Sequence, residues 1–258
     1  MAAFPLKIST MSVKRILKGT VALVFWIGVW AIGAKIINQV LILPSPLTVA
    51  KRLLSLSVTG DFWIKTGTSL LRIFLGWMFG IIAGAILAVL SSASSLCNVL
   101  ISPVIHIVKA TPVTSFILLV MLWLGYSNVP VFIAALLVLP IVYGNITTGV
   151  LQTDGKLLEV AKIYRFGRMK TLSKVYFPSV RPYLLSACVT SLGLAWKAGI
   201  AAEVLCQPKR AIGSEIYYSR YYLETPDLFA WTAVVILLSY LLEKLFRLIF
   251  KKGVQNEI

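Results

Sequence analysis

The order of apolar and polar residues divides this chain into six long apolar segments separated by short polar or proline-containing breaks. The segments run from about Thr20 to Leu43, Leu70 to Leu90, Val99 to Leu124, Val131 to Val150, Pro182 to Leu205 and Leu228 to Leu242. A helix of roughly 20 mostly apolar residues is long enough to cross a bilayer. The pattern therefore predicts an all-α, polytopic membrane protein with about six transmembrane helices.

Prolines and glycines refine this picture at two places. The sequence LPSP, from Leu43 to Pro46, predicts a helix boundary, because proline disfavours helix at its own position and at the residue before it. The amphipathic piece that follows, Leu47 to Leu56, is expected to lie at the outer surface. In the second segment Gly76, Gly80 and Gly84 recur every four residues, which places them on one helix face and allows another helix to approach closely.

The longest polar interruption is a basic segment, Glu159 to Pro178, with the sequence EVAKIYRFGRMKTLSKVYFP. It lies within a loop at about residues 151–181, and it carries five lysines and arginines against one acid. Loops rich in lysine and arginine between membrane spans are retained in the cytoplasm. Apolar residues alternate with the charges in a helical pattern, so the segment is expected to dock on lipid headgroups or on a soluble partner protein.

The distribution of charge supports one orientation of the chain. Of the 25 lysines and arginines, 15 lie in the segments that would be inside, 7 in those that would be outside and 3 within spans. The seven assigned to the outside are Lys51, Arg52, Lys65, Arg72, Lys209, Arg210 and Arg220. This bias predicts a cytoplasmic N-terminus over residues 1–19, one transmembrane domain over 20–250 and a cytoplasmic tail over 251–258. The first apolar segment is too long for a signal peptide and is expected to remain as a span. The net charge of +16 therefore reflects topology, and nucleic-acid binding is not expected.

Four residues inside the apolar segments are candidates for a translocation pathway. Lys109 is expected near the middle of the third span, close to Pro112, which weakens the local helix. Lys197 and Glu203 both lie in the fifth span, six residues apart, so they face different directions on one helix. Ionisable groups in a membrane usually face a cavity or a partner. The lysines either line a path that favours an anion, or form structural ion pairs or snorkel to an interface.

Four tyrosines gather in the polar segment before the last span, at Tyr217, Tyr218, Tyr221 and Tyr222. Amphipathic aromatic rings collect at membrane interfaces, so the cluster is expected at the outer interface. The same surface could also receive an external protein.

The chain lacks the sequence features of an enzyme or a metalloprotein. It has no GxxxxGK[ST] phosphate-binding loop, and its single histidine, His106, is too few for most metal sites. The three cysteines have no metal-ligand spacing. We therefore expect no catalytic residues, no metal and no cofactor bound by this chain.

The basic segment and its surroundings resemble a known family, the permease subunits of bacterial ABC importers. The family's cytoplasmic signature begins Glu-Ala-Ala, contains a glycine and ends at a proline about twenty residues after the glutamate. Here Glu159-Val160-Ala161 matches the beginning, and Phe177-Pro178 matches the end. LPSP and the apolar sequences SLLRIFLGWMFGIIAGAILAVL and ACVTSLGLAWKAGIAAEVL are similar to the nitrate, sulfonate and taurine branch.

The resemblance implies a type I ABC importer permease fold in a bacterial inner membrane. The basic segment would then be a coupling loop whose short helices dock in a groove on an ATP-binding subunit. In this loop Glu159 would lie at the rim of the groove, and Pro178 would provide a rigid connection to the membrane. The apolar residues that would enter the groove are Val160, Ala161, Ile163, Tyr164 and Phe166. The family glycine would fall six residues after Glu159, where this chain has Arg165, and the nearest glycine is Gly167. The turn of the loop is therefore expected to be shifted or built differently.

The resemblance also implies the partners. They are a second permease copy, cytoplasmic subunits that bind ATP and Mg, an extracytoplasmic solute-binding protein and the lipid bilayer. Two other classes remain as alternatives. An ATP-independent secondary transporter or channel would be expected to show inverted repeats, and none is apparent. An integral membrane enzyme would need a catalytic set.

Overall fold

The structure, a computed structural model, describes residues 8–255, and every regular element in that range is a helix. The elements in chain order are α1 Ile8–Ile37, α2 Pro46–Ser57, α3 Gly60–Ala93, α4 Ser95–Ala110, α5 Val113–Val120, α6 Val129–Leu151, α7 Gly155–Ile163, α8 Arg168–Thr171, the π-helix η1 Leu172–Tyr176, α9 Phe177–Cys206, α10 Ile212–Tyr221 and α11 Thr225–Gln255. Five described helices are long and apolar enough to span a membrane, or six if the bent pair α4–α5 counts as one span. The predicted all-α membrane fold is confirmed.

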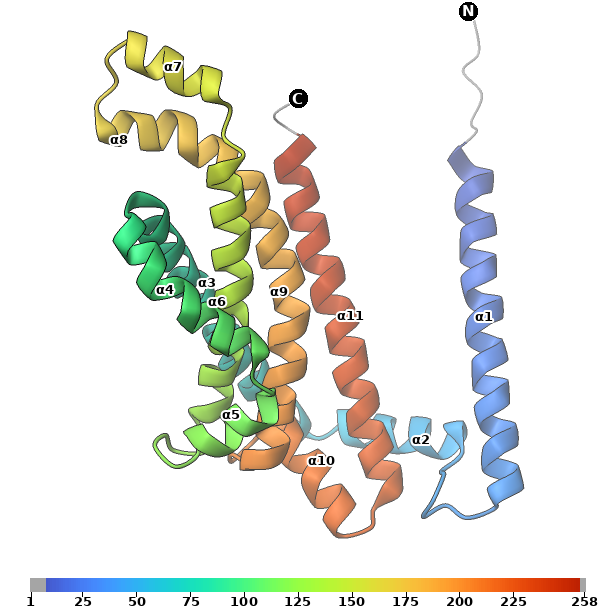
Figure 1. Ribbon diagram of the computed structural model, residues 1–258. Helices are drawn as coiled ribbons and strands as arrows, with labels where there is room; N and C mark the ends of the chain where they lie inside the picture. Colours follow the sequence, from blue (N-terminus) through green and yellow to red (C-terminus); the bar gives the residue numbers. More distant parts are fainter. Residues whose placement is uncertain (1–7, 256–258) are drawn as a thin grey trace, which may run out of the picture.

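The two ends of the helix bundle differ (Figure 1). One end carries α7, α8 and η1, which fold back on each other as a hairpin (residues 155–176), and we call it the hairpin end. The opposite end carries α2, α5 and α10, and we call it the cap end. The described part of α1 begins at the hairpin end, and that of α11 finishes there.

The centre of the bundle is formed by α3, α6 and α9, which pack around buried residues such as Ile73, Val138 and Trp196. The glycine face predicted on α3 lies against α6. A Cβ added at Gly80 would lie 2.6 Å from the carbonyl oxygen of Ala135, and one at Gly84 would lie 2.7 Å from that of Leu139. Because no side chain fits there, the glycines allow the two backbones to pack in direct contact, as the sequence indicated.

The third apolar segment is not the single span that its length suggested. It forms two helices, α4 and α5, which meet at an angle of 104°. The break falls at Thr111 and Pro112, because proline cannot donate a backbone hydrogen bond and disfavours helix at the preceding residue. Pro103 lies inside α4 without breaking it. The bend directs α5 across the cap end instead of through the bundle (Figure 1).

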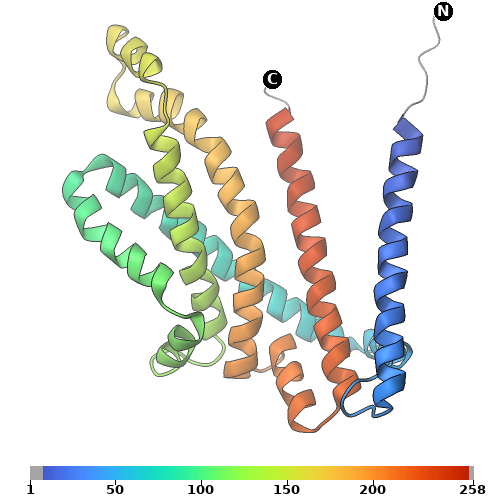
Figure 2. The same cartoon turned by 45° about the vertical axis from the view of Figure 1, so that its right-hand side comes forward.

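Helix α1 stands apart from the rest of the bundle, as both views of the ribbon show (Figures 1 and 2). Near the cap end Trp30 donates a hydrogen bond to the carbonyl oxygen of Pro44 at 3.1 Å and stacks on Phe229 of α11. Only 6% of its membrane-length window is buried within this chain. It ends at Ile37 and not at Leu43, so the turn before LPSP begins earlier than predicted.

Candidate functional site

The hairpin is built from local signals in the basic segment. Asp154 begins α7 by accepting a hydrogen bond from the amide of Lys156 at 2.9 Å, a side-chain cap that satisfies one of the free amides of the first turn. Ala161 of α7 and Val175 of η1 are buried, and they form the small apolar interior between the two arms. The predicted helical coupling segment is therefore a self-contained helical hairpin.

The turn of the hairpin is at the position where the family has its glycine. Arg165 has φ +51°, in the left-handed region that glycine adopts most easily. The amide of Phe166 donates to the carbonyl of Ala161 at 2.8 Å, and that of Arg165 donates to Lys162 at 3.0 Å. These bonds form a Schellman motif, the usual end of a helix that finishes in a left-handed residue. Of the two expected alternatives, the turn is not shifted but is built differently, with Arg165 in the glycine conformation, and Gly167, with φ −66°, is the N-cap of α8.

Apolar and basic side chains share the outer surface of the hairpin. Ile163 and Tyr164 are 76% and 72% exposed, and Val160 and Glu159 are also exposed. Sequence reasoning missed Met169, which is 79% exposed, although its place among basic residues was a signal. Such a surface is unusual for solvent alone and indicates a partner.

Two residues predicted as apolar contacts instead hold the hairpin together. Ala161 is buried between its arms. Phe166 is half-buried, and the Lys170 ammonium lies 4.2 Å from the centre of its ring. A partner can reach Ile163 and Tyr164 directly, whereas Ala161 is covered by the hairpin itself.

The hairpin is connected to the bundle by continuous helix. In the π-helical turn the amide of Phe177 donates to the carbonyl of Leu172, one residue further back than in an α-helix. Pro178 lies in the first turn of α9, directly after this widened turn, and Pro182 lies four residues further on. The chain is helical without a break from Arg168 to Cys206, but it bends near the start of α9 (Figure 1), so Pro178 lies in a continuous, bent helical connection.

The two candidate pathway lysines are both exposed in the single chain. Lys109 lies in the last turn of α4, beside the break at Pro112, and not in the middle of a straight span as predicted. Its Nζ atom lies 3.7 Å from where a Cβ at Gly144 of α6 would be. Within the described part of the chain neither Lys109 nor Lys197 forms an ion pair. The interpretation as structural ion pairs within one chain therefore has no support.

Glu203, the third ionisable candidate, has 0% exposure and lies in a polar cluster between helices. Its carboxylate accepts hydrogen bonds from Ser69 Oγ at 2.8 Å, from Arg72 at 2.7 Å and from the amide of Gly213 at 3.2 Å. The carboxylate points into the protein, and the prediction that it lines a pathway stays a prediction. Sequence reasoning missed Arg72 because it assigned this residue to an outer loop, whereas it lies within α3.

Further ion pairs join the helices of the cap end. Arg52 of α2 donates two hydrogen bonds to Asp227 of α11, at 2.5 and 2.7 Å. The hydrogen bond to Asp227 raises the pKa of the Arg52 guanidinium, which keeps the pair charged. Lys65 of α3, also assigned by sequence to an outer loop, contacts Glu215 of α10 at 2.7 Å. These two pairs therefore join α2 to α11 and α3 to α10 at this end.

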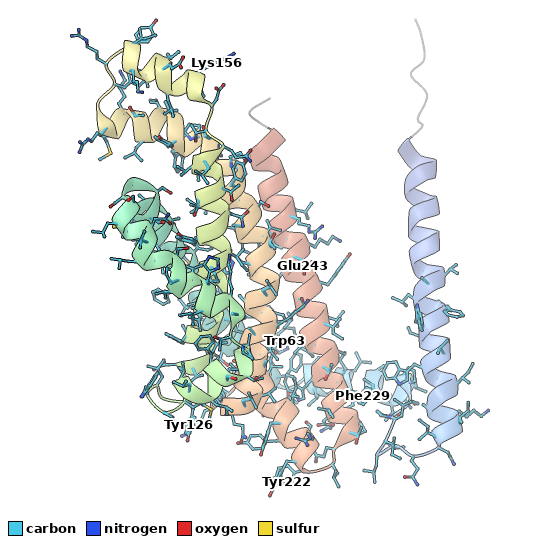
Figure 3. All side chains as sticks on the ribbon, in the orientation of Figure 1. Trp63, Tyr126, Lys156, Tyr222, Phe229 and Glu243 are labelled. Carbon is cyan, nitrogen blue, oxygen red and sulfur yellow. The ribbon has the colours of Figure 1, made fainter. Side chains whose placement is uncertain are left out.

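The predicted tyrosine cluster lies on α10 and just after it, at the cap end. Tyr217 stacks on Tyr221 and Tyr218 stacks on Tyr222, with ring centroids 6.3 and 6.5 Å apart. Tyr221 and Tyr222 are exposed, and Figure 3 shows Tyr222 at the extreme of the cap end. The cluster is a preformed aromatic surface at the end opposite Lys156, which labels the hairpin in the same figure.

Comparison with known proteins supports this arrangement. The family described as "Binding-protein-dependent transport system inner membrane component" matches residues 78–254. The chain is similar to the transport permease protein SsuC of Bacillus subtilis (strain 168), whose name links it to aliphatic sulfonates, with 26% identity over 238 residues, 92% of this chain and 86% of that protein. It is also similar to the taurine transport system permease protein TauC of Escherichia coli (strain K12), with 23% identity over 231 residues, 87% of this chain and 83% of that protein.

The fold has a counterpart among solved structures. The crystal structure of an amino acid ABC transporter with histidines superposes with a TM-score of 0.60 at 17% sequence identity. The superposition covers 71% of this chain and 90% of that chain. The resemblance to permease subunits of ABC transporters and the predicted fold are confirmed.

Proposed function

The chain belongs to the family of inner membrane components of binding-protein-dependent transport systems, and we propose that it is the permease subunit of an ATP-driven importer. The single observation that carries this proposal is the hairpin, with its exposed apolar residues and surrounding basic charges. In this proposal the hairpin end faces the cytoplasm, where lysine- and arginine-rich segments are retained.

The hairpin surface fits a soluble ATP-binding subunit with an apolar groove and an acidic rim. Ile163 and Tyr164 project from the end of α7, where they can enter a groove. Arg165 and Arg168 flank them and can pair with carboxylates, while Glu159 provides an opposite charge one to two turns earlier. That subunit would bind the ATP and Mg. Its conformational change would be transmitted to this chain through the docked hairpin.

Co-purification tests this step. Wild-type chain is expressed with a candidate ATP-binding subunit and compared with Ile163→Asp/Tyr164→Ala, with Glu159→Ala and with deletion of residues 164–167. We expect a stable wild-type complex that the deletion and the double substitution abolish and that Glu159→Ala weakens. Leu241→Ala, an exposed change on α11, is the control. An intact complex without residues 164–167, or no complex at all, would favour lipid binding and an ATP-independent transporter.

The exposed face of α9 supports a second copy as the partner within the membrane. Its exposed residues recur every three or four positions and include Thr190, Lys197 and Ala201. A lysine on such a face is costly against lipid and needs a water-filled cavity or a protein partner. We infer that two copies meet along this face and enclose the translocation pathway, with Lys197, Lys109 and the bend at Pro112 beside it.

Cysteine crosslinking distinguishes this face from the rest of the surface. Ala201→Cys is expected to form a covalent dimer on oxidation in membranes. Leu241→Cys, which is also exposed but lies on α11, should remain monomeric. The reverse result would place the contact between copies on another helix.

The unpaired lysines favour a small anionic solute. Two positive charges along a low-dielectric path attract anions and repel cations. The names of the relatives refer to taurine and aliphatic sulfonates, which agrees with this chemistry. Reversal to Lys109→Glu and Lys197→Glu should abolish uptake of the solute that the wild-type transports, whereas full uptake by both variants would exclude the anion pathway.

The aromatic surface of α10 is the proposed site for the external solute-binding protein. Exposed tyrosines supply large contact area at low entropic cost, and Arg220 lines a shallow pocket of about 330 Å³ beside them. This surface lies at the end opposite the hairpin, as delivery from outside the cell requires.

A further inference from the structure

The N-terminus of α10 is capped by side chains from two other helices. The residue at the N-cap position, Ala211, has no side chain that could accept a hydrogen bond. Instead the amide of Ile212 donates to Ser69 Oγ of α3 at 2.9 Å, and the amide of Gly213 donates to the Glu203 carboxylate of α9 at 3.2 Å. Free amides and the helix dipole favour a negative charge at this end, so the buried carboxylate holds α10 by its first turn.

Close packing makes this junction stiff. A Cβ added at Gly213 would overlap the Cβ of Glu203 and lie 2.6 Å from the amide nitrogen of Val204, so the backbones of α9 and α10 are in contact. Ser214 Oγ donates to the carbonyl of Pro208 at 2.6 Å and closes the short link between the two helices. Arg72 completes the charge balance of Glu203, and all three helices therefore meet at one satisfied polar cluster.

Helix α9 connects this junction to the hairpin. The chain is helical through 39 residues, from Arg168 beside the hairpin turn to Cys206 beside the junction. The segment bends near the start of α9, so that α8 and η1 lie at an angle to the rest of α9 (Figure 1). The tyrosine surface on α10 and the basic surface of the hairpin are thus attached to opposite ends of one continuous helix (Figure 2).

We propose that Glu203 is a positioning residue that holds the first turn of α10 on α9, so that movement of the hairpin is transmitted through α9 to the tyrosine surface, and movement of that surface to the hairpin. The inference rests on the proposed function, since a bound ATP-binding subunit supplies the movement. Coupling between two sites acts in both directions, so an external protein on α10 would in turn favour one position of the hairpin. The role differs from that of a pathway residue, because the carboxylate is fully buried and its hydrogen bonds go to Ser69, Arg72 and the amide of Gly213.

Two reporter positions test the transmission. A fluorescent label is attached at Lys156→Cys on the hairpin or at Tyr222→Cys on the cap, in a Cys97→Ser background, because the remaining cysteines are buried. The complex with its co-purified ATP-binding subunit is reconstituted in nanodiscs, and fluorescence is followed on addition of Mg-ATP and vanadate. Both labels should respond in the otherwise wild-type chain.

Substitutions at the junction should separate the two responses. In Glu203→Gln the hairpin label should respond as before, while the response at Tyr222→Cys falls at least about fivefold, the lower end of typical coupling between sites. Ser69→Ala keeps the Arg72–Glu203 pair and should give a smaller loss, which covers the case that Glu203→Gln does not fold. Glu215→Gln removes an ion pair on the same α10 and is the matched control, with an unchanged response.

The responses of the two labels decide whether the junction transmits movement from the hairpin to the tyrosine surface. A full cap response in both Glu203→Gln and Ser69→Ala would overturn the inference, as would a wild-type cap label that never responds while the hairpin label does. Failure of the proposed function is recognised earlier and separately, because no ATP-binding subunit would then co-purify with the wild-type chain.

Discussion

The two ends of this molecule differ in whether their basic residues have carboxylate partners within the chain. At the cap end Arg52, Arg72 and Lys65 each have a carboxylate partner within the chain. At the hairpin end Arg165 and Arg168 surround exposed apolar residues, and no described carboxylate is paired with them. These three basic residues of the cap end are paired by its own fold, whereas Arg165 and Arg168 of the hairpin are left for another molecule to pair. Substitutions of the paired residues at the cap end should therefore lower stability, whereas substitutions on the hairpin surface should mainly lower partner binding.

The largest effect on stability is expected at the buried pair of the cap end. Arg72→Met leaves the Glu203 carboxylate buried without a counter-charge, which should lower the free energy of unfolding by about 3–5 kcal/mol. Arg247→Met is the same substitution in an exposed pair whose atoms are 3.8 Å apart, and should cost less than about 1 kcal/mol. Thermal unfolding of the two variants in one detergent compares them. Equal losses would mean that the buried pair contributes no more than a surface one.

The second-largest loss in the free energy of unfolding is expected at the close contact between α3 and α6. Gly80→Ala places a methyl group against the Ala135 carbonyl and should cost about 1–3 kcal/mol through overpacking. Gly67→Ala in the same helix meets nothing within 4 Å and should be neutral or stabilising by up to about 1 kcal/mol. The same unfolding measurement applies. If both variants behave alike, the glycine face does not set the distance between the helices.

Glycine in place of Arg165 at the turn should stabilise the hairpin. Arg165→Gly relieves the left-handed backbone of a non-glycine residue and should stabilise the hairpin by about 0.5–1 kcal/mol after the entropic cost of glycine. Arg168→Gly, in the right-handed helix α8, should instead cost about 1 kcal/mol. Hydrogen exchange at the amides of Arg165 and Phe166 reports the local stability. Faster exchange in Arg165→Gly would contradict the assigned turn.

The smallest effect on folding should come from the surface of the hairpin. Ile163→Ser should change the free energy of unfolding of the isolated chain by no more than about 0.5 kcal/mol, since the side chain contacts little of its own fold. Ala161→Leu, two residues earlier and buried, should cost about 1–3 kcal/mol. Binding to the ATP-binding subunit should fall in Ile163→Ser despite its unchanged stability. Retained binding would move the docking surface elsewhere on the hairpin.

Much of the site could be located from sequence because its signals are local. The basic segment was recognised from the alternation of charged and apolar residues, and its helices follow from a cap at Asp154 and a turn six residues after Glu159. The identity of the turn residue was misleading. Glycine is the usual residue with a positive φ, but the hydrogen bonds of the Schellman motif hold Arg165 in the same conformation.

Pairs that are far apart in sequence could not be located in this way. Arg72 and Glu203 are separated by 131 positions, so no helical spacing connects them. Counting charges placed Arg72 in an outer loop, because a charge is costly in a membrane unless a partner compensates it. Only the packing of α3 against α9 and α10 shows that partner, and with it the tertiary cap of α10.

The sequence by itself determined the class of this protein, the number of long apolar segments and the position of the basic hairpin. These depend on the length of apolar runs, on helix caps and on charge, all of which act over a few residues. The tertiary structure decided that the third segment bends by 104° at Pro112, that α1 stands apart and that Glu203 fastens α10 to α9. Those outcomes depend on which helix surfaces pack together. In a bilayer any apolar helix face is compatible with lipid, so close backbone contacts and buried charge pairs determine the packing.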